Sequence, residues 1–153
     1  MKPIMQETIQ IGKTKFIVKC YSDKLKSIFD WTKNLIEQIY PIVIKDQQLK
    51  LPAEIQVVID SKFKKFHKRG EKEKWVYGTM NHKLNMITFY PSVTFNEPKN
   101  KIIGFTKHLQ DYAYVMIHEL LHYKYKKNEL KTAEETNKMF KKFVWKKKEW
   151  TYR

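Results

Sequence analysis

The spacing of apolar residues near the N-terminus predicts a β-hairpin. Apolar and polar residues alternate over 7–11 and again over 14–21, and Gly12-Lys13 stands between the two runs. A period of two places the apolar side chains on one face of a strand, and a glycine suits the tight turn between two such strands. The N-terminal part of the chain is therefore predicted to form two antiparallel strands.

Apolar residues at helical spacing predict three helices. They recur every three or four positions over 25–39, where Pro41 closes the run, and again on a broad face over 109–121. No glycine or proline occurs within or after the second run, and Asn128 is the best candidate for a break, because asparagine tolerates the left-handed conformation at a helix end. A third helix is then expected to run to about Trp150.

Three runs between the first and second helices have the composition of strands. They are 54–60, 75–80 and 84–90, the last of which is ended by Pro91. A chain of 153 residues suits one compact domain with a buried core. We therefore expect an α+β fold in a single domain, 1–153, in which an N-terminal helix and a small mixed or antiparallel sheet pack against the C-terminal helices.

Lysine dominates the charge of the protein. The formal net charge is +15, and Arg69 and Arg153 are the only arginines. Such a charge attracts polyanions or acidic partners. However, isoleucine and asparagine are also plentiful while glycine and alanine are scarce, which an AT-rich genome produces as well, and proteins that recognise base sequence generally use arginine. Charge alone therefore predicts only a weak association with nucleic acid.

Three features bear on the location of the protein. Cys20 is the only cysteine, which excludes an internal disulfide and a zinc site built mainly from thiolates. No apolar run approaches the roughly 20 residues that span a bilayer. Residues 1–7 contain no apolar segment of a secretory signal. We therefore expect a cytoplasmic protein without a membrane segment.

The strongest chemical signal is His118-Glu119-Leu120-Leu121-His122, within the second predicted helix. Two histidines four residues apart lie on one helix face, so their ring nitrogens can converge on one metal ion. Glu119 points toward the same open side, where it can take a proton from a metal-bound water. This H-E-x-x-H spacing is that of zinc metalloproteases. The residues around it are uncharged in a lysine-rich chain, which predicts that the motif is buried.

A catalytic zinc site needs a third protein ligand in addition to the two histidines. No histidine follows the motif, so an acidic residue on the next helix is the natural source, and the candidates are Glu134 and Glu135. Glu134 begins a stripe of lysines that is typical of a solvated face, whereas Glu135 begins an apolar stripe. Helical facing therefore favours Glu135, with Glu134 as the alternative. Glu135 also fits a capping box that starts at Thr132, which would be a purely structural role.

Several other side chains are candidates to stabilise negative charge that develops on a substrate. The histidines outside the motif lie in predicted loops or ahead of the motif helix, where exposed side chains are expected. The sequence does not select among these candidates, which are His67, His82, His108, Tyr90 and Tyr112.

The motif resembles that of the zincin superfamily of metallopeptidases, and among these the gluzincins, whose third ligand is a glutamate on the helix after the motif. The small size is similar to that of the members called minigluzincins. The resemblance covers 118–122 firmly and extends loosely to the two candidate glutamates and the strand pair 75–90. It implies that both histidines bind zinc, that Glu119 is the general base, and that an edge strand lines the substrate cleft. Residues 84–90 would be that strand.

These observations predict a zinc-dependent endopeptidase that acts on peptides or proteins, acidic ones among them. His118, His122 and Glu135 would hold the zinc, and Glu119 would accept the proton of the attacking water. The alternative is a basic module that binds nucleic acid or an acidic partner, with the zinc structural or absent. A third interpretation is a latent proenzyme, in which the N-terminal hairpin or the C-terminal tail blocks the cleft.

Overall fold

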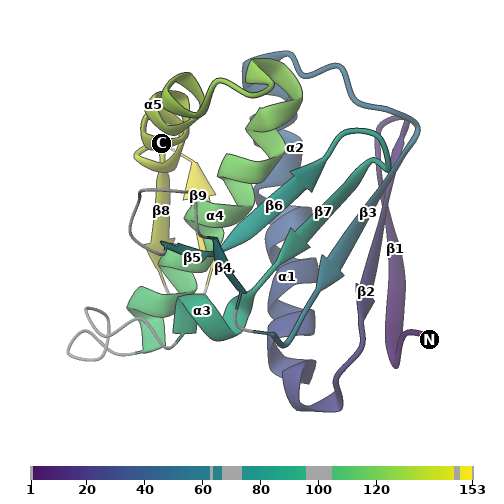
Figure 1. Cartoon of the computed structure of the whole chain (residues 1–153). Coiled ribbons are helices and arrows are strands. Elements are labelled where there is room, and N and C mark those ends of the chain that lie inside the picture. Colours follow the sequence, from purple (N-terminus) through teal and green to yellow (C-terminus); the bar gives the residue numbers. More distant parts are fainter. Residues whose placement is uncertain (1, 63, 67–73, 96–104, 147–148, 153) are drawn as a thin grey trace.

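A five-stranded sheet forms the centre of the molecule, and helices cover one of its faces (Figure 1). This computed structural model describes residues 2–62, 64–66, 74–95, 105–146 and 149–152. The predicted N-terminal hairpin is confirmed as β1 (Met5–Ile11) and β2 (Thr14–Cys20), which pair antiparallel. Gly12 lies in the turn with a φ of 57°, a left-handed conformation that glycine adopts without steric cost.

The strand order is β1-β2-β3-β7-β6. β3 (Glu54–Ile59) runs parallel to both β2 and β7 (Met86–Phe89), and β6 (Gly78–Asn81) pairs antiparallel with β7 at the sheet edge. The strand expected over 84–90 is therefore β7, which lies inside the sheet and is not its edge. The run 75–80 is divided between β6 and the short β5 (Lys74–Val76), which pairs with β4 (Lys64–Phe66) in a separate sheet.

The first helical region contains two helices where the apolar pattern predicted one. After a short 3-10 turn, η1 (Asp23–Leu25), α1 runs over Lys26–Gln38 and α2 over Tyr40–Gln47. Pro41 does not end the helical region but lies in the first turn of α2. A proline is tolerated there because the first amide groups of a helix have no intrahelical acceptor.

The C-terminal region is less helical than predicted. α3 (Pro91–Phe95) precedes α4 (Phe105–Tyr125), which carries the whole motif, and α5 (Glu129–Phe140) follows. The expectation that α5 reaches Trp150 is wrong, because β8 (Phe143–Lys146) and β9 (Glu149–Tyr152) form an antiparallel hairpin there. Valine, threonine and aromatic residues are frequent in this stretch, and these residue types favour strands.

The core lies between the sheet and the helices, and it fixes the position of α4. Alternate residues of the central strands are buried on the helix-covered side: Phe16, Val18, Cys20, Ile55, Val57, Ile59, Ile87 and Phe89. The predicted apolar face of α4 is buried against them: Leu109, Tyr112, Ala113, Met116, Ile117, Leu120 and Leu121. Among the described residues, no helix is long and apolar enough to cross a membrane.

Two buried hydrogen bonds also hold α4 against the first helices. The Tyr40 hydroxyl of α2 donates to the carbonyl oxygen of Met116 at 2.9 Å. The hydroxyls of Tyr112 and Thr32 lie 2.8 Å apart, and Thr32 donates onward to the carbonyl of Ile28. Because buried polar groups are costly without partners, these bonds favour one setting of α4 in the core.

Candidate metal centre

The motif lies in the middle of an unbroken helix, as the sequence predicted. His118 and His122 are one turn apart on α4, with ring centroids 4.9 Å from each other. The ligand atoms of His118, Glu119 and His122 all lie within 4.8 Å of one another. These three side chains therefore form a group that can hold a metal ion.

Each histidine uses Nδ1 for a contact within the protein. His122 Nδ1 lies 2.6 Å from the carbonyl oxygen of Lys126, and His118 Nδ1 lies 3.5 Å from the hydroxyl of Thr136. The Thr136 hydroxyl donates to the carbonyl of Thr132, so it can accept the proton of the His118 Nδ1–H group. Both contacts orient the rings so that the Nε2 atoms are left for a ligand.

The carboxylate of Glu129 lies against both Nε2 atoms. Its Oε2 is 3.1 Å from Nε2 of His118, and its Oε1 is 2.9 Å from Nε2 of His122. Tetrahedral zinc with ligand bonds of about 2.1 Å separates its ligand atoms by roughly 3.4 Å. The arrangement is therefore close to that of three side chains sharing one ion.

The two glutamates predicted from the sequence have other partners. Glu135 is the more buried of the two, as expected, but its carboxylate lies 3.5 Å from Nζ of Lys131 and 3.6 Å from Nζ of Lys138. Glu134 is exposed and lies 3.6 Å from Nζ of Lys138. Neither is the carboxylate that the structure places against the histidines, a position taken by Glu129 instead.

The sequence did not point to Glu129. The break between the two helices is at the predicted position, but the backbone conformation predicted for Asn128 is wrong. Asn128 has a φ of −77° and is the N-cap of α5, with its side chain accepting from Lys131 N at 3.0 Å. Lys126, and not Asn128, takes the left-handed conformation, with a φ of 53°. Glu129 thus begins α5, on the same helix face as the buried Thr132 and Thr136. That pattern of small polar residues three and seven positions later is the signal that could have identified it.

The two Nε2 atoms face the carboxylate of Glu129, an arrangement that a proton on the rings or a bound cation would stabilise. With Nδ1 of His122 donating to a carbonyl, the Nε2 atom of a neutral ring has a lone pair, which faces a carboxylate oxygen at 2.9 Å. Burial lowers the pKa of His118 and the neighbouring His122 lowers it further, while Glu129 partly offsets this shift. A bound cation satisfies both lone pairs and the carboxylate together.

Glu119 is buried beside this group. Its exposed fraction is 6%, and burial, followed by the charge of Glu129, raises the pKa of its carboxyl to about 8. A carboxyl whose pKa is raised in this way and which lies in a pocket is typical of a group used in proton transfer. It is also the kind of pKa shift that a nearby metal charge reverses.

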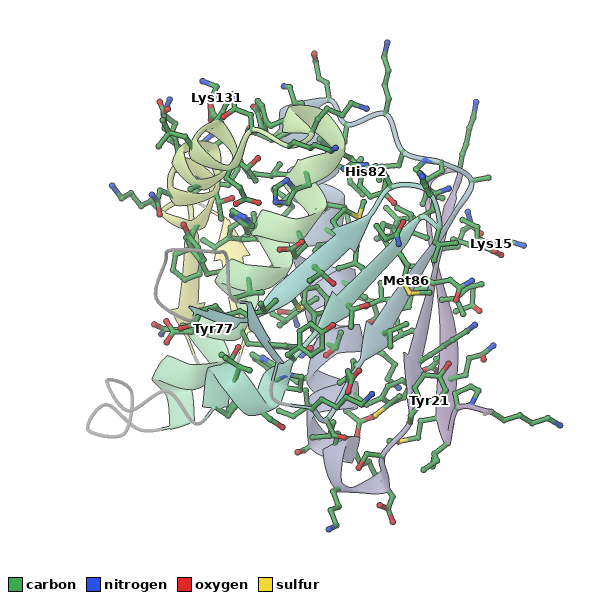
Figure 2. The ribbon with its side chains drawn as sticks, viewed as in Figure 1. Lys15, Tyr21, Tyr77, His82, Met86 and Lys131 are labelled. Carbon is green, nitrogen blue, oxygen red and sulfur yellow. The ribbon has the colours of Figure 1, made fainter. Side chains whose placement is uncertain are left out.

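An open pocket of about 330 Å³ gives access to the centre. It is lined by Glu119, His122 and Glu129, by residues of the strand β6, and by His82, Lys126 and Lys127. Figure 2 shows His82 at the end of the β6–β7 hairpin, beside the C-terminal half of α4. The ring of His82 also packs edge-on against Tyr123, with centroids 5.8 Å apart.

Among the described side chains proposed to stabilise developing charge, His82 is the one that lines this pocket. Tyr112 is buried in the core and bonds to Thr32, which excludes it from the pocket. Tyr90 is buried and does not line the pocket either. His67 and the side chain of His108 lie outside the described residues.

Gly78 allows β6 to lie directly over Glu119. A Cβ atom there would be 3.1 Å from Cγ of Glu119, 3.1 Å from Cγ1 of Val115 and 3.3 Å from the carbonyl oxygen of Thr88. These separations are tighter than ordinary van der Waals contact, and the Thr88 oxygen belongs to the backbone of the paired strand. The glycine therefore sets the close approach of the sheet edge to the motif.

Replacement of Gly78 by alanine is expected to lower the free energy of unfolding by about 1–3 kcal/mol, the usual cost of overpacking. Urea denaturation of the wild type and Gly78→Ala measures this. The same substitution in a Val115→Ala background should cost less, because one of the two closest side-chain neighbours is then shortened. An equal cost in both backgrounds would contradict a steric origin.

No family model matches the chain, and a search of curated proteins returns no match either. The interpretation of the centre therefore depends on the chemistry of its side chains.

Proposed function

We propose that this protein is a zinc-dependent endopeptidase. The observation that carries the proposal is the convergence of two histidine Nε2 atoms and one carboxylate beside a buried glutamate, at an open pocket that Glu119, His122 and Glu129 line. The zinc ligands are His118, His122 and Glu129. This assignment keeps the two predicted histidines and replaces Glu135 with Glu129.

The donor set supports zinc as the metal. Two imidazole nitrogens and one carboxylate are typical of catalytic zinc sites, in which three protein ligands leave one position open. The two positive charges of the zinc ion would then be balanced by the carboxylates of Glu129 and Glu119. Oxygen-only donor sets, which calcium and magnesium prefer, are not what this pocket offers.

Each side chain has a definite role in the proposed reaction. Zinc in such a site supplies Lewis-acid chemistry, activating a water molecule and polarising the carbonyl of the scissile bond. Glu119 accepts the proton of the attacking water and delivers it to the leaving amine. The carbonyl of Lys126 and the hydroxyl of Thr136 hold the two histidine rings in their ligating orientation.

The position of β6 supports an extended peptide as the substrate. β6 is the edge of the five-stranded sheet, and Gly78, Thr79 and Met80 line the pocket. No strand pairs with its outer side in the part of the chain that the structure describes. An extended peptide bound there as an additional strand would gain main-chain hydrogen bonds irrespective of its sequence. The interior of a long peptide can occupy such an edge, which favours an endopeptidase.

The position of the N-terminal hairpin bears on the alternative of a latent proenzyme. β1 and β6 form opposite edges of the same sheet, so the N-terminal hairpin lies away from the pocket (Figure 1). Blockage of the cleft by this hairpin would require it to leave the sheet. The proposal is therefore an enzyme whose pocket is not covered by its N-terminal strands.

Metal removal tests the proposal. The purified protein is expected to contain one zinc ion per chain by elemental analysis, and His122→Ala is expected to contain none. A chelator should abolish cleavage of a mixture of unstructured fluorogenic peptides, and added zinc should restore it, because three protein ligands bind the ion reversibly. Absence of zinc from the wild type after reconstitution would overturn the proposal.

The high net charge is the observation that favours the second candidate, a basic module that binds nucleic acid or an acidic partner. In that case zinc at the centre is structural, and a change at Glu119 has no functional consequence. Binding to nucleic acid would also weaken steeply as the salt concentration rises. The substitution of Glu119 considered in the Discussion separates the two functions.

A further inference from the structure

Two adjacent lysines line the pocket. Lys126 and Lys127 lie between α4 and α5, in the short connection that separates His122 from Glu129. Both are exposed, and within the described ranges neither ammonium group has an ion-pair partner. They differ in this from Lys131 and Lys138 on α5, which lie near the carboxylates of Glu134 and Glu135.

The backbone groups of both lysines form hydrogen bonds with residues of the candidate metal centre. Lys126 N donates to the carbonyl of His122 at 2.9 Å, and its own carbonyl lies 2.6 Å from Nδ1 of the same histidine. The carbonyl of Lys127 accepts from Glu129 N at 3.0 Å. The Cα atoms of the two lysines are therefore fixed relative to the residues that we assign as zinc ligands, although their side chains extend into solvent.

The charges of these lysines affect another residue of the pocket, His82. Burial lowers the pKa of His82, which lines the same pocket, and the charges of Lys126, His122 and Lys127 lower it further. Because Lys126 and Lys127 line the same pocket as His82, their ammonium groups contribute positive potential within it. A group that enters the pocket therefore experiences both ammonium charges.

The charges within the pocket leave this positive potential unbalanced once a divalent cation is bound. Glu119 and Glu129 are the acidic residues that line the pocket, and together they match one dication. The two lysines then have no counterpart among the lining residues. We propose that Lys126 and Lys127 form a subsite for a carboxylate of the substrate, next to the bond that is cleaved. This inference rests on the proposed peptidase function and names the class of peptide that it selects.

A peptide can supply the carboxylate in two ways. An aspartate or glutamate side chain near the scissile bond would make the enzyme selective for acidic sequences. The α-carboxylate of the last residue would instead direct cleavage to the C-terminus. The chemistry at the lysines is the same in both cases, so the peptides used in the test must separate the two sources.

Binding to an inactive variant tests the subsite without turnover. Zinc-loaded Glu119→Gln is titrated with fluorescently labelled peptides of neutral sequence, acetylated and amidated, in which one glutamate is moved along the chain. Matched peptides have glutamine at the same position, with either an amidated or a free C-terminus. We expect glutamate at one position to strengthen binding roughly three- to tenfold, the usual range for an exposed charge pair, and the gain to shrink as salt is added.

Variants of the two lysines assign the effect to the subsite. Lys126→Gln/Lys127→Gln, combined with Glu119→Gln, should lose the preference, and the corresponding double arginine variant should keep it. The matched control is Lys13→Gln/Lys24→Gln, which removes the same charge at two exposed positions that do not line the pocket. A preference that persists without the pocket lysines, or that is lost equally in the control, overturns the inference.

The outcomes also separate this inference from the proposed function. Equal binding of the glutamate peptides and of both glutamine peptides, amidated and with a free C-terminus, by a zinc protein that does cleave peptides overturns the subsite alone. Selective binding by a protein that cleaves none of them overturns the peptidase function and leaves the carboxylate subsite in place. Stronger binding only of the glutamine peptide with a free C-terminus, compared with its amidated counterpart, identifies the α-carboxylate as the ligand.

Discussion

Glu129→Gln is expected to weaken zinc binding about a hundredfold or more, whereas Glu135→Gln should leave it unchanged. Loss of a charged ligand exceeds the 10- to 100-fold effect of losing a group that merely supports a ligand. Glu129 contacts both Nε2 atoms, at 2.9 and 3.1 Å, while Glu135 faces two lysines. Competition with a chromogenic chelator measures the affinity of each variant.

The variants Glu129→Gln and Glu135→Gln are well matched, because both substitutions remove one negative charge from the same helix and keep the size of the side chain. A general effect of charge on zinc binding would therefore appear in both variants. Weakened binding in Glu135→Gln, with normal binding in Glu129→Gln, would restore the ligand set expected from the sequence. Glu134→Gln serves as a third variant, and its exposed position predicts no change.

Glu119→Gln is expected to abolish peptide hydrolysis while zinc content and fold are retained. An amide cannot accept the proton of the attacking water, and loss of a general base typically lowers the rate by about 10² to 10⁴. Glutamine has nearly the same shape as glutamate, so the packing under Gly78 is preserved. Cleavage rates of fluorogenic peptides, zinc content by elemental analysis and the urea unfolding midpoint are the three measurements.

The stability of this variant is an informative control. Glu119 is buried, and the raised pKa of its carboxyl shows that the ionised form is disfavoured in the metal-free protein. A neutral glutamine in its place should therefore not destabilise the metal-free fold at neutral pH. Unchanged hydrolysis in Glu119→Gln would instead support the second candidate function, in which the motif holds a structural zinc.

The sequence by itself was sufficient for the features that depend on local periodicity. The alternation around Gly12 predicted the β1–β2 hairpin, and the apolar face over 109–121 predicted the helix that carries the motif. The spacing of His118 and His122 then determined that their rings share a helix face. These features could be predicted because one turn of helix, or two residues of strand, contains all of the relevant geometry.

Features that depend on context were predicted less well. Pro41 was expected to end a helix, but a proline also suits a first helical turn, and only the packing of α2 decides between the two. The run after Phe140 is compatible with helical spacing, yet pairing of β8 with β9 makes it a hairpin. In both cases the local pattern allows two structures with similar energies, and contacts distant in the sequence determine which one forms.

The tertiary structure alone placed a carboxylate against the two histidines and brought the residues of the pocket together. Glu129 is exposed and begins a face of two threonines without an apolar stripe, so the apolar facing that favoured Glu135 did not select it. The left-handed turn at Lys126 reverses the chain and directs the first residue of α5 toward the histidines. Likewise, β6 becomes the sheet edge over Glu119 only through its pairing with β7. The two histidines need one helical turn to meet, whereas the complete centre needs a helix, a turn and a strand that the core brings together.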